Sequence, residues 1–275
     1  MKKLARRAQL FHGMHVTMDP QWQSELNKAG ISDNDDWLSL TGELVASGGA
    51  TKCYRLQLDN GETVYFKRYV YRRRHLQFWM LPSKPLLEVS GYQTLKNIGL
   101  PAPEVIAYGE KRQYGDLRAA FIITREIPDT QNLEDYARNV WVYLPAAQRK
   151  QIFQHIAPQV IDMAKTIHKN HFYHYDLKWR NILIQGAPEN SKIVFIDCPR
   201  SRVSYLRPLR GQEMDLSGLA RIAMYYFRRS EQLRLLVQYS GSREQAKKLF
   251  RRIQRRLQSR YPKDPRPEEI DYKLI

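Results

Sequence analysis

The stretch His174-Tyr175-Asp176-Leu177-Lys178-Trp179-Arg180-Asn181-Ile182-Leu183-Ile184 decides the fold of this chain. It places an aspartate, a lysine and an asparagine at close offsets immediately before an apolar strand. A second apolar strand, Ile193-Val194-Phe195-Ile196, runs directly into another acid, Asp197. Phosphoryl transfer asks a protein mainly to position a hydroxyl, the phosphates and a metal ion. This order of acids and amide therefore predicts the catalytic loop of a phosphotransferase.

Each polar residue of this loop has an expected role. Asp176 can accept the proton of the acceptor hydroxyl. Lys178 lies on the same face of an extended loop, where it can neutralise the transferring phosphoryl group. Asn181 and Asp197 can hold Mg²⁺ against the nucleotide. We expect His174 to brace the loop by hydrogen bonding rather than to take protons.

A simpler interpretation of the same stretch is a β-hairpin whose Asp and Asn residues only cap turns. That interpretation accounts for the turn-forming residues, but not for this order of polar types followed by two strands and a second acid. The protein-kinase signature set has the same order. We therefore favour the catalytic loop.

The bulk composition is that of a globular protein. The chain has 275 residues, of which 43% are apolar and 11% aromatic, so it can bury a substantial core as one large domain or two lobes. Cys53 and Cys198 form no disulfide framework and no metal-ligand spacing. No apolar signal core follows the basic N-terminus, and no run approaches the ~20 apolar residues of a membrane span. We expect a cytoplasmic chain.

The charge is strongly positive. Lys and Arg outnumber Asp and Glu by 45 to 28, which leaves a formal charge of +17 and a pI near 9.8. Such an excess implies an anionic partner, whether nucleic acid, a membrane face or a phosphate-bearing substrate. The excess gathers in two blocks, Arg68 with Arg72, Arg73, Arg74 and His75, and Lys247, Lys248, Arg251, Arg252, Arg255 and Arg256.

The chain divides by pattern into three parts. We expect residues 1–40 to be an extension with a short helix near 21–28, 41–127 to be an N-lobe, and 128–275 to be a C-lobe. Three strands are expected early in the N-lobe, at 44–46, 53–58 and 63–69, because Gly48-Gly49 and the hairpin signal Asp59-Asn60-Gly61-Glu62 separate them. A helix over 85–98 and strands at 105–108 and 119–124 follow. Arg125–Pro128 then leaves the sheet as a hinge. Helices are expected at 151–169, 213–227 and 242–260.

Lys67 is the expected phosphate-binding lysine of the N-lobe. It lies on the third strand, where a lysine can reach the nucleotide phosphates, and Glu88 on the following helix is its natural ion-pair partner. The turn at Gly48 and Gly49 could cradle phosphates with its backbone N–H groups, although a plain hairpin turn explains these glycines almost as well. We also assign Thr124 and Glu126, where the chain leaves the sheet, to the nucleotide site.

Two features outside the loop leave alternatives open. Asp215 could brace the catalytic loop or simply cap a helix. The C-terminal helix has an apolar stripe opposite its basic residues, and it is either a core-packing helix or an electrostatic seat on an anionic membrane. The Arg68–Arg74 cluster with the apolar residues at 76–81 is a better candidate for contact with headgroups and glycolipid phosphates.

At several segments the chain resembles the bacterial lipopolysaccharide core kinases, which phosphorylate Kdo or heptose sugars and belong to the protein-kinase-like superfamily. The resemblance covers roughly residues 40 to 225. It is carried by Tyr65-Phe66-Lys67-Arg68-Tyr69, Phe78-Trp79-Met80-Leu81-Pro82-Ser83-Lys84, the segment from Gly99-Leu100-Pro101-Ala102-Pro103 to Ala107-Tyr108-Gly109-Glu110, the stretch 174–184, and Phe195-Ile196-Asp197.

The resemblance implies a two-lobed protein-kinase-like fold of the α+β class, with a small antiparallel sheet and one helix in the N-lobe and a mainly helical C-lobe. It implies ATP with Mg²⁺, Asp176 as catalytic acid/base, and Asn181 and Asp197 as metal ligands. Lys67 with Glu88 would position the phosphates. The implied acceptor is a hydroxyl of a heptose or Kdo sugar on an anionic glycolipid, the lipid A-core. The catalytic loop and the charge of +17, without a membrane span, favour peripheral contact with the cytoplasmic face of the inner membrane. Nucleic acid is not an expected partner.

The chain also departs from the protein-kinase pattern. Asp197 is followed by Cys198-Pro199 rather than Phe-Gly, no Ala-Pro-Glu follows, and Asp215 comes soon after. A regulated platform for protein substrates is therefore disfavoured. Two alternatives stay open at this point: a protein or aminoglycoside-type kinase, and a non-enzymatic basic pseudokinase or nucleic-acid-binding module.

Overall fold

The computed structural model describes residues 11–262 except 33–34, 73–77 and 80. The chain divides into two compact units. Unit 1 consists of Met1–Gln93 with Pro103–Ile127, and unit 2 consists of Thr94–Ala102 with Pro128–Ile275. The expected hinge, Arg125–Pro128, contains the last boundary between these units along the chain, between Ile127 and Pro128.

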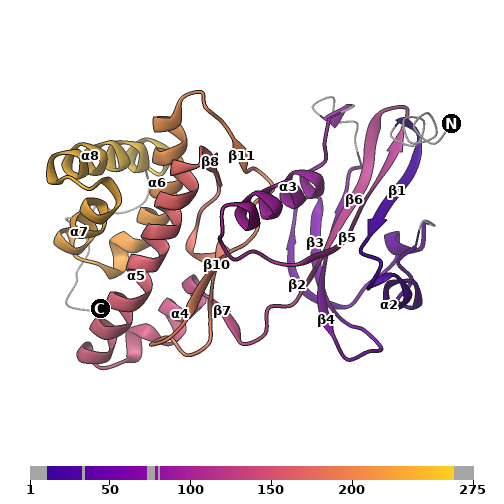
Figure 1. Ribbon diagram of the computed structural model, residues 1–275, viewed down its shortest axis with the longest axis horizontal. Helices are drawn as coiled ribbons and strands as arrows, with labels where there is room; N and C mark the ends of the chain where they lie inside the picture. The colour runs from indigo at the N-terminus through magenta and orange to yellow at the C-terminus, as the bar shows by residue number, and fades with distance from the viewer. Residues whose placement is uncertain (1–10, 33–34, 73–77, 80, 263–275) are drawn as a thin grey trace. The chain divides into compact units, whose positions relative to one another are not determined.

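Unit 1 is built on a six-stranded sheet in which neighbouring strands are antiparallel and follow the order β1-β5-β6-β4-β3-β2 (Figure 1). The strands are β1 (Gly13–Met18), β2 (Glu43–Gly48), β3 (Thr51–Gln57), β4 (Thr63–Val70), β5 (Val105–Gln113) and β6 (Asp116–Arg125). The helices are α2 (Gln23–Lys28), the 3-10 turn η1 (Asp35–Leu38) and α3 (Lys84–Asn97), whose last residues are grouped with unit 2.

The hairpin predicted between β3 and β4 is present. Gly61 has a φ of 81°, a conformation that favours glycine, and the Glu62 N–H donates to Oδ1 of Asn60 at 3.0 Å. The turn brings Leu56 opposite Val64 and Cys53 opposite Lys67. This register places Lys67 in the interior of the sheet rather than at its edge.

Alternation along β4 supplies both faces of the sheet. Val64 and Phe66 pack with Trp22, Leu26 and Trp37 from the N-terminal segment. Successive side chains of a strand point to opposite faces, so Lys67, between Phe66 and Arg68, points the other way, where it meets α3. Figure 1 shows α2 and α3 on opposite sides of this sheet.

The segment expected to be an extension, residues 1–40, contributes to unit 1. β1 pairs with β5 over its whole length, from Gly13 opposite Arg112 to Met18 opposite Ala107. Trp37 is fully buried, and its ring packs at a tilt against Phe121, with 4.8 Å between the ring centroids. These residues supply part of the hydrophobic core of the sheet.

The prediction that Arg68 belongs to a basic cluster on the surface is wrong. Arg68 is buried, donates hydrogen bonds to the carbonyls of Trp37, Leu38 and Leu40, and lies over the ring of Tyr54. The guanidinium supplies hydrogen bonds to backbone carbonyls of residues 37–40, which lie outside the strands of the sheet. These hydrogen bonds compensate for the burial of the charged group in this core. Residues 73–77 and 80 of the cluster lie outside the described residues.

Unit 2 is mainly helical. Its helices are α4 (Leu133–Asn139), the 3-10 turns η3 (Trp141–Tyr143) and η4 (Trp179–Asn181), α5 (Ala146–Lys169), α6 (Pro208–Tyr226), α7 (Arg229–Ser240) and α8 (Arg243–Arg260). Its short strands form a three-stranded sheet, β10-β9-β7, and a two-stranded sheet, β11-β8. These are β7 (Thr130–Asn132), β8 (Phe172–Tyr173), β9 (Ile182–Gln185), β10 (Lys192–Phe195) and β11 (Arg202–Val203). An antiparallel sheet with separate helices confirms the α+β class.

The apolar stripe of α8 is buried. Ala246, Phe250 and Ile253 are buried, and α8 packs on α6 and α7. The core-packing interpretation of this helix is therefore correct, and its basic residues form the outer face. Within the described residues, no helix is both long enough and apolar enough to cross a membrane.

Candidate active site

The catalytic-loop residues of unit 2 are held by the β9–β10 hairpin. Antiparallel pairing places Ile182 opposite Phe195. The next residue, Ile196, donates its backbone N–H to the carbonyl of Asn181 at 3.0 Å. Asp197 therefore follows directly beside Asn181, although the two are far apart in sequence.

Asn181 is oriented by the loop that it terminates. Its side chain is 3% exposed, and Nδ2 donates to the backbone carbonyl of Asp176 at 2.9 Å. The amide nitrogen of Asn181 is therefore bound to the loop, and the amide oxygen takes no part in this hydrogen bond. Asp197 is half-buried and has a φ of 58°, a left-handed conformation that is uncommon outside glycine.

Asp176 and Lys178 form an ion pair. Lys178 Nζ lies 2.5 Å from Oδ1 of Asp176, and both side chains are partly open to solvent. The pair confirms that the two residues share one face of the loop. The lysine therefore places a positive charge directly beside this carboxylate.

His174 supports the loop, as expected from the sequence. It is fully buried, its Nε2 lies 3.1 Å from the carbonyl oxygen of Ile196, and its ring packs edge-on against Phe195. The histidine thus ties the start of the catalytic loop to the end of β10, two residues from Asp197.

Asp215 braces the backbone of the loop. It lies well inside α6 rather than at its beginning, which excludes the N-cap interpretation. Its carboxylate accepts the N–H of His174 at 2.9 Å and the N–H of Tyr175 at 2.6 Å. Tyr175 has a φ of 60°, so these bonds hold a backbone conformation that is unfavourable by itself.

Two residues outside the predicted set extend this brace. His168 of α5 lies 3.1 Å from the Asp215 carboxylate through Nε2 and 2.8 Å from the Tyr239 hydroxyl through Nδ1. Burial, followed by the charge of Asp215, raises the pKa of Tyr239. Helices α5, α6 and α7 are therefore joined by polar contacts directly behind the loop.

Unit 1 contributes an ion pair between β4 and α3. Lys67 Nζ lies 2.9 Å from Oε2 and 3.3 Å from Oε1 of Glu88, whose carboxylate is almost fully buried. Tyr92, one turn further along α3, donates its hydroxyl to Oε1 of Glu88 at 2.8 Å. Lys67 is thereby held in one orientation on the face of the sheet that meets α3.

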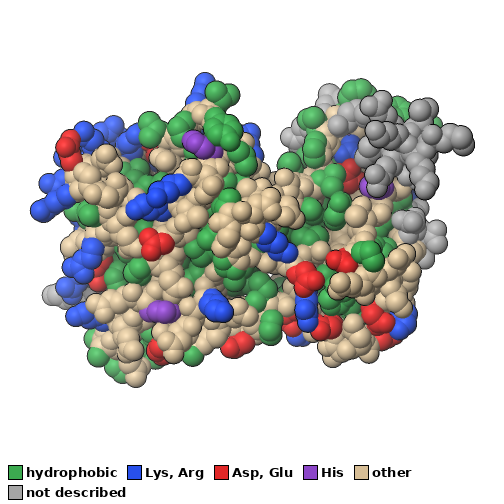
Figure 2. Space-filling model, in the orientation of Figure 1, with side chains coloured by type: hydrophobic (Ala, Val, Ile, Leu, Met, Phe, Trp, Pro, Cys, Tyr) green, Lys and Arg blue, Asp and Glu red, His purple; other side chains and the backbone are tan. Residues whose placement is uncertain are grey.

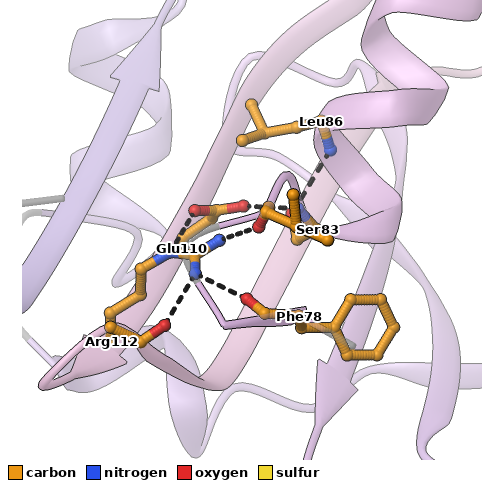
Figure 3. A network of polar contacts seen from close by, with 7 residues as sticks. Phe78, Ser83, Leu86, Glu110 and Arg112 are labelled. Carbon is orange, nitrogen blue, oxygen red and sulfur yellow. Dashed lines mark hydrogen bonds and ion pairs between the residues drawn. The ribbon is translucent and has the colours of Figure 1, made fainter. Parts of the chain in front are cut away.

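A buried network fixes the beginning of α3 (Figure 3). Glu110 and Arg112 on β5 are each about 5% exposed and are joined at 2.8 Å. Glu110 accepts the N–H of Ser83 at 2.8 Å, while Arg112 donates to the carbonyls of Phe78, Leu81 and Gly115. The sequence signal for this pair is two opposite charges two residues apart in a strand, because such residues share one face.

The remaining predicted nucleotide residues lie elsewhere in unit 1. Gly48 ends β2 and Gly49, with a φ of 56°, forms the turn into β3. Thr124 on β6 lies opposite Tyr65. The Glu126 carboxylate is engaged by Arg55 at 3.0 Å and by the Tyr65 hydroxyl at 3.1 Å. The Arg55 hydrogen bond lowers the pKa of Glu126.

The structure thus brings the predicted residues together in two groups. In unit 2, Asp176, Lys178, Asn181 and Asp197 cluster around one loop. In unit 1, Lys67 meets Glu88, while the pairs Gly48 with Gly49 and Thr124 with Glu126 occupy a turn and the end of β6. Sequence reasoning missed the supporting residues Tyr92, Glu110, Arg112, His168 and Tyr239.

Comparison with known proteins agrees with this geometry. The family model described as "Lipopolysaccharide kinase (Kdo/WaaP) family" matches residues 51–250. The lipopolysaccharide core heptose(I) kinase WaaP of Escherichia coli strain K12 is 30% identical over 129 residues, which is 46% of this chain and 48% of that protein. A second WaaP from Escherichia coli is 29% identical over 136 residues, 48% of this chain and 50% of that protein. The chain spans about half the length of these curated relatives.

A solved structure of WaaP in complex with acyl carrier protein has the same fold. It superposes with a TM-score of 0.68 at 18% identity and covers 90% of this chain and 99% of that one. The kinase-like fold expected from the catalytic loop is therefore confirmed.

Proposed function

This chain belongs to the lipopolysaccharide kinase (Kdo/WaaP) family, and from that premise we propose that it transfers the terminal phosphoryl group of ATP to a hydroxyl of a heptose or Kdo sugar of the lipopolysaccharide inner core. The observation that carries the proposal is the grouping of Asp176, Asn181 and Asp197 around one braced loop. Two acids and an amide in this order are what a hydroxyl acceptor and a metal-bound nucleotide require.

Asp176 is the residue that receives the acceptor's proton. Its carboxylate is partly open to solvent, so a sugar hydroxyl can approach it. Lys178 lies against the same carboxylate and offsets the charge of the incoming phosphoryl group. Asn181 holds the backbone of Asp176 through its carbonyl, which keeps the acid oriented toward the acceptor.

Asn181 and Asp197 are the residues that would hold Mg²⁺. Both can present oxygen donors, which Mg²⁺ prefers, and Mg²⁺ generally takes only one or two protein ligands beside phosphates and waters. Among the described residues, no group of three or more His, Cys, Asp or Glu side chains is placed to bind a metal by itself. When bound, the ion would neutralise charge on the nucleotide phosphates.

Lys67 is the proposed ligand of those phosphates in unit 1. Glu88 and Tyr92 keep its ammonium on one face of the sheet, and a fixed cation costs little reorganisation when phosphate arrives. We assign the N–H groups of the turn at Gly48 and Gly49 to the same nucleotide. Thr124 and Glu126, at the end of β6, are proposed to line the base, with Glu126 acting through its backbone because its carboxylate is engaged by Arg55.

In this proposal residues 41–127 act as the N-lobe and 128–275 as the C-lobe, with 1–40 added to the first. The reaction would take place at the cytoplasmic face of the inner membrane, where the glycolipid acceptor is made accessible. The net charge of +17 supports an anionic acceptor of this kind.

Incubation with ATP, Mg²⁺ and core oligosaccharide that lacks its phosphate tests the proposal. Mass spectrometry should detect product heavier by about 80 Da, the mass of one added phosphate. Asp176→Asn should lower kcat by roughly 10²–10⁴-fold, the usual contribution of a general base. Peptide and aminoglycoside acceptors assayed in parallel would identify a protein or small-molecule kinase instead.

Asp162→Asn is the matched control. Asp162 lies on α5, is exposed, and accepts a hydrogen bond from Gln238 that an asparagine oxygen can also accept. It should keep full activity. If Asp176→Asn also keeps full activity, or if the unaltered protein phosphorylates none of these acceptors, the proposed function is wrong.

An apolar cavity in unit 2 favours a second function, the binding of an acylated carrier protein. The helices of unit 2 surround a narrow apolar cavity of about 120 Å³. Its lining includes Trp141, Ile156, Trp179, Phe227, Leu236 and Phe250. A solved WaaP was captured with acyl carrier protein, and an apolar cavity of this kind suits an alkyl chain. Native mass spectrometry should then detect tighter binding of acylated than of unacylated carrier protein. Equal binding of the two forms would show that the cavity does not hold the acyl chain.

A further inference from the structure

The loop between β11 and α6 exposes an unusual run of apolar side chains. Val203 is 47% exposed, Tyr205 73%, Leu206 82% and Leu209 54%. Single exposed apolar residues are normal, but a contiguous group of them marks an interaction surface. Figure 2 shows hydrophobic and basic side chains together at the edge of unit 2, over this loop.

The same loop is strongly basic. Arg200, Arg202, Arg207 and Arg210 are all exposed, and the sequence has no Asp or Glu between Asp197 and Glu213. In the described part of the chain, no carboxylate forms an ion pair with any of these four arginines. We call residues 200–210 the arginine loop.

Exposed arginines mixed with leucine and tyrosine match the surface of an anionic bilayer. Arginine binds phosphate through two parallel hydrogen bonds. Tyrosine is enriched at the depth of lipid headgroups, and leucine gains by leaving water for the acyl boundary. α6 also begins in this loop, at Pro208, and the beginning of a helix favours negative charge.

The base of the arginine loop is fastened to the strand that leads into the catalytic loop. Arg202 lies opposite Tyr173 in the pairing of β11 with β8, and Ser204 donates its N–H to the carbonyl of His171 at 2.8 Å. The Arg202 guanidinium lies 4.9 Å from the ring centroid of Tyr175, the residue before Asp176. A surface bound by this loop is therefore held at a fixed distance from the proposed catalytic acid.

We propose that the arginine loop binds the surface of an anionic lipid bilayer and so holds the catalytic loop at the membrane that carries the acceptor. This inference deepens the proposed function and rests on it, because only a lipid-linked acceptor gives the contact a use. The basic face of α8 is the weaker candidate, since the apolar stripe of that helix is already buried in unit 2.

Sedimentation of the full chain with lipid vesicles tests the inference. Vesicles of phosphatidylcholine mixed with phosphatidylglycerol should bind the protein, and vesicles of phosphatidylcholine alone should not. Arg207→Gln with Arg210→Gln should weaken binding by about 25-fold, from about fivefold for each arginine near an anionic surface. Tyr205→Ser with Leu206→Ser should weaken it by about tenfold, because it removes apolar area from the interface.

Two matched controls locate the effect. Arg251→Gln with Arg255→Gln removes the same charge from the outer face of α8, and Tyr143→Ser removes an apolar side chain that is 81% exposed elsewhere in unit 2. Both should retain binding within about twofold, since neither changes the arginine loop. Thermal unfolding of every variant should match that of the unaltered protein, because all these side chains are at the surface.

Either of two results would overturn the inference: equal binding to both kinds of vesicle, or equal weakening by the loop and α8 variants. Absence of binding to both kinds of vesicle would also overturn it and would leave a protein partner for this loop. The assay contains no ATP and no acceptor, so its outcome is independent of whether the phosphorylation assay succeeds.

Discussion

Lys67 on β4 and Glu88 on α3 form an ion pair in which the carboxylate is almost completely withdrawn from water, with Nζ 2.9 Å from Oε2. A buried carboxylate is stable only when it is paired and hydrogen-bonded, and here Tyr92 supplies the additional hydrogen bond. The lysine, by contrast, keeps part of its surface exposed. The geometry therefore fixes the glutamate carboxylate, which in turn orients the lysine ammonium.

Substitutions at Lys67 and Glu88 should distinguish phosphate binding by the lysine from orientation of the lysine by the glutamate. Lys67→Met should lower kcat/KM by roughly 10²-fold, as expected when a preorganised phosphate-binding group is lost. Glu88→Gln should lower it less, because an amide still accepts from Tyr92 but holds the lysine weakly. The double variant should resemble Lys67→Met, since the glutamate acts through the lysine. Steady-state kinetics with ATP varied provides the measurement.

Glu134→Gln is the control for this series, because Glu134 forms an ion pair with Arg138 on the surface of α4. It should change neither kinetics nor stability by more than about 0.5 kcal/mol. Strictly additive losses in the Lys67 and Glu88 double variant would contradict a shared role.

A second prediction concerns the close approach of α6 to the catalytic loop. A Cβ on Gly218 would collide with the carbonyl oxygen of Leu177 and lie 3.1 Å from its carbonyl carbon. Gly218→Ala should therefore displace the backbone next to Asp176. We expect kcat to fall at least tenfold and the free energy of unfolding to fall by about 1–3 kcal/mol, the usual cost of overpacking.

Helix propensity predicts the opposite sign for the same change, since alanine stabilises a helix interior by about 1 kcal/mol relative to glycine. Ser259→Ala, exposed on α8, gains propensity without approaching another segment and should be neutral or stabilising. Chemical denaturation of both variants decides between the two effects. If the Gly218→Ala protein is stabilised and fully active, the backbone at Leu177 can move aside without cost and the predicted clash is wrong.

Local sequence patterns predicted the parts of the fold that depend on near neighbours. The Asp59–Glu62 turn needs only a glycine in a left-handed conformation and an asparagine beside it. The catalytic loop and the strand into Asp197 follow from short spacings in the same way. The pairing of α3 with Lys67 was predictable because an acid on the next helix follows a lysine on a strand.

The parts that sequence could not predict depend on distant partners. Arg68 belongs to a run of basic residues, yet its partners are carbonyls of residues 37–40, which no local pattern connects to it. β1 pairs with β5, a strand far from it in the sequence. α7 was not anticipated, because its residues have only a weak apolar stripe and its place depends on packing against α5 and α8. The arginine loop is recognisable only when the exposure of its side chains is known.

A third prediction concerns the buried Glu110–Arg112 pair, which positions the start of α3. Removing one partner leaves the other charge buried and uncompensated, so Glu110→Gln and Arg112→Met should each lower the free energy of unfolding by about 3–5 kcal/mol. Arg112→Met should be the worse of the two, because it also leaves the carbonyls of Phe78, Leu81 and Gly115 without their donor. Urea denaturation monitored by circular dichroism provides the measurement.

The double variant Glu110→Gln with Arg112→Met should be less destabilised than the sum of the single variants, because no charge remains buried. Arg125→Met, which removes a surface partner of Glu62, is the matched control and should cost less than about 1 kcal/mol. Additive single and double effects would show that the two residues do not depend on each other.

The final prediction concerns stability at alkaline pH. Burial, followed by the negative charge of Glu110, raises the pKa of Tyr71 to about 12. In the unfolded chain this phenol ionises near its ordinary pKa of about 10. Between these two values the unfolded state has lost the proton and the folded state has kept it, so the free energy of unfolding falls as pH rises. Tyr71→Phe should remove up to about 2 kcal/mol of that loss. Tyr143→Phe, at an exposed position, should leave the alkaline profile unchanged. Denaturation midpoints recorded from pH 8 to pH 12 provide the test, and parallel profiles for the unaltered protein and Tyr71→Phe would refute it.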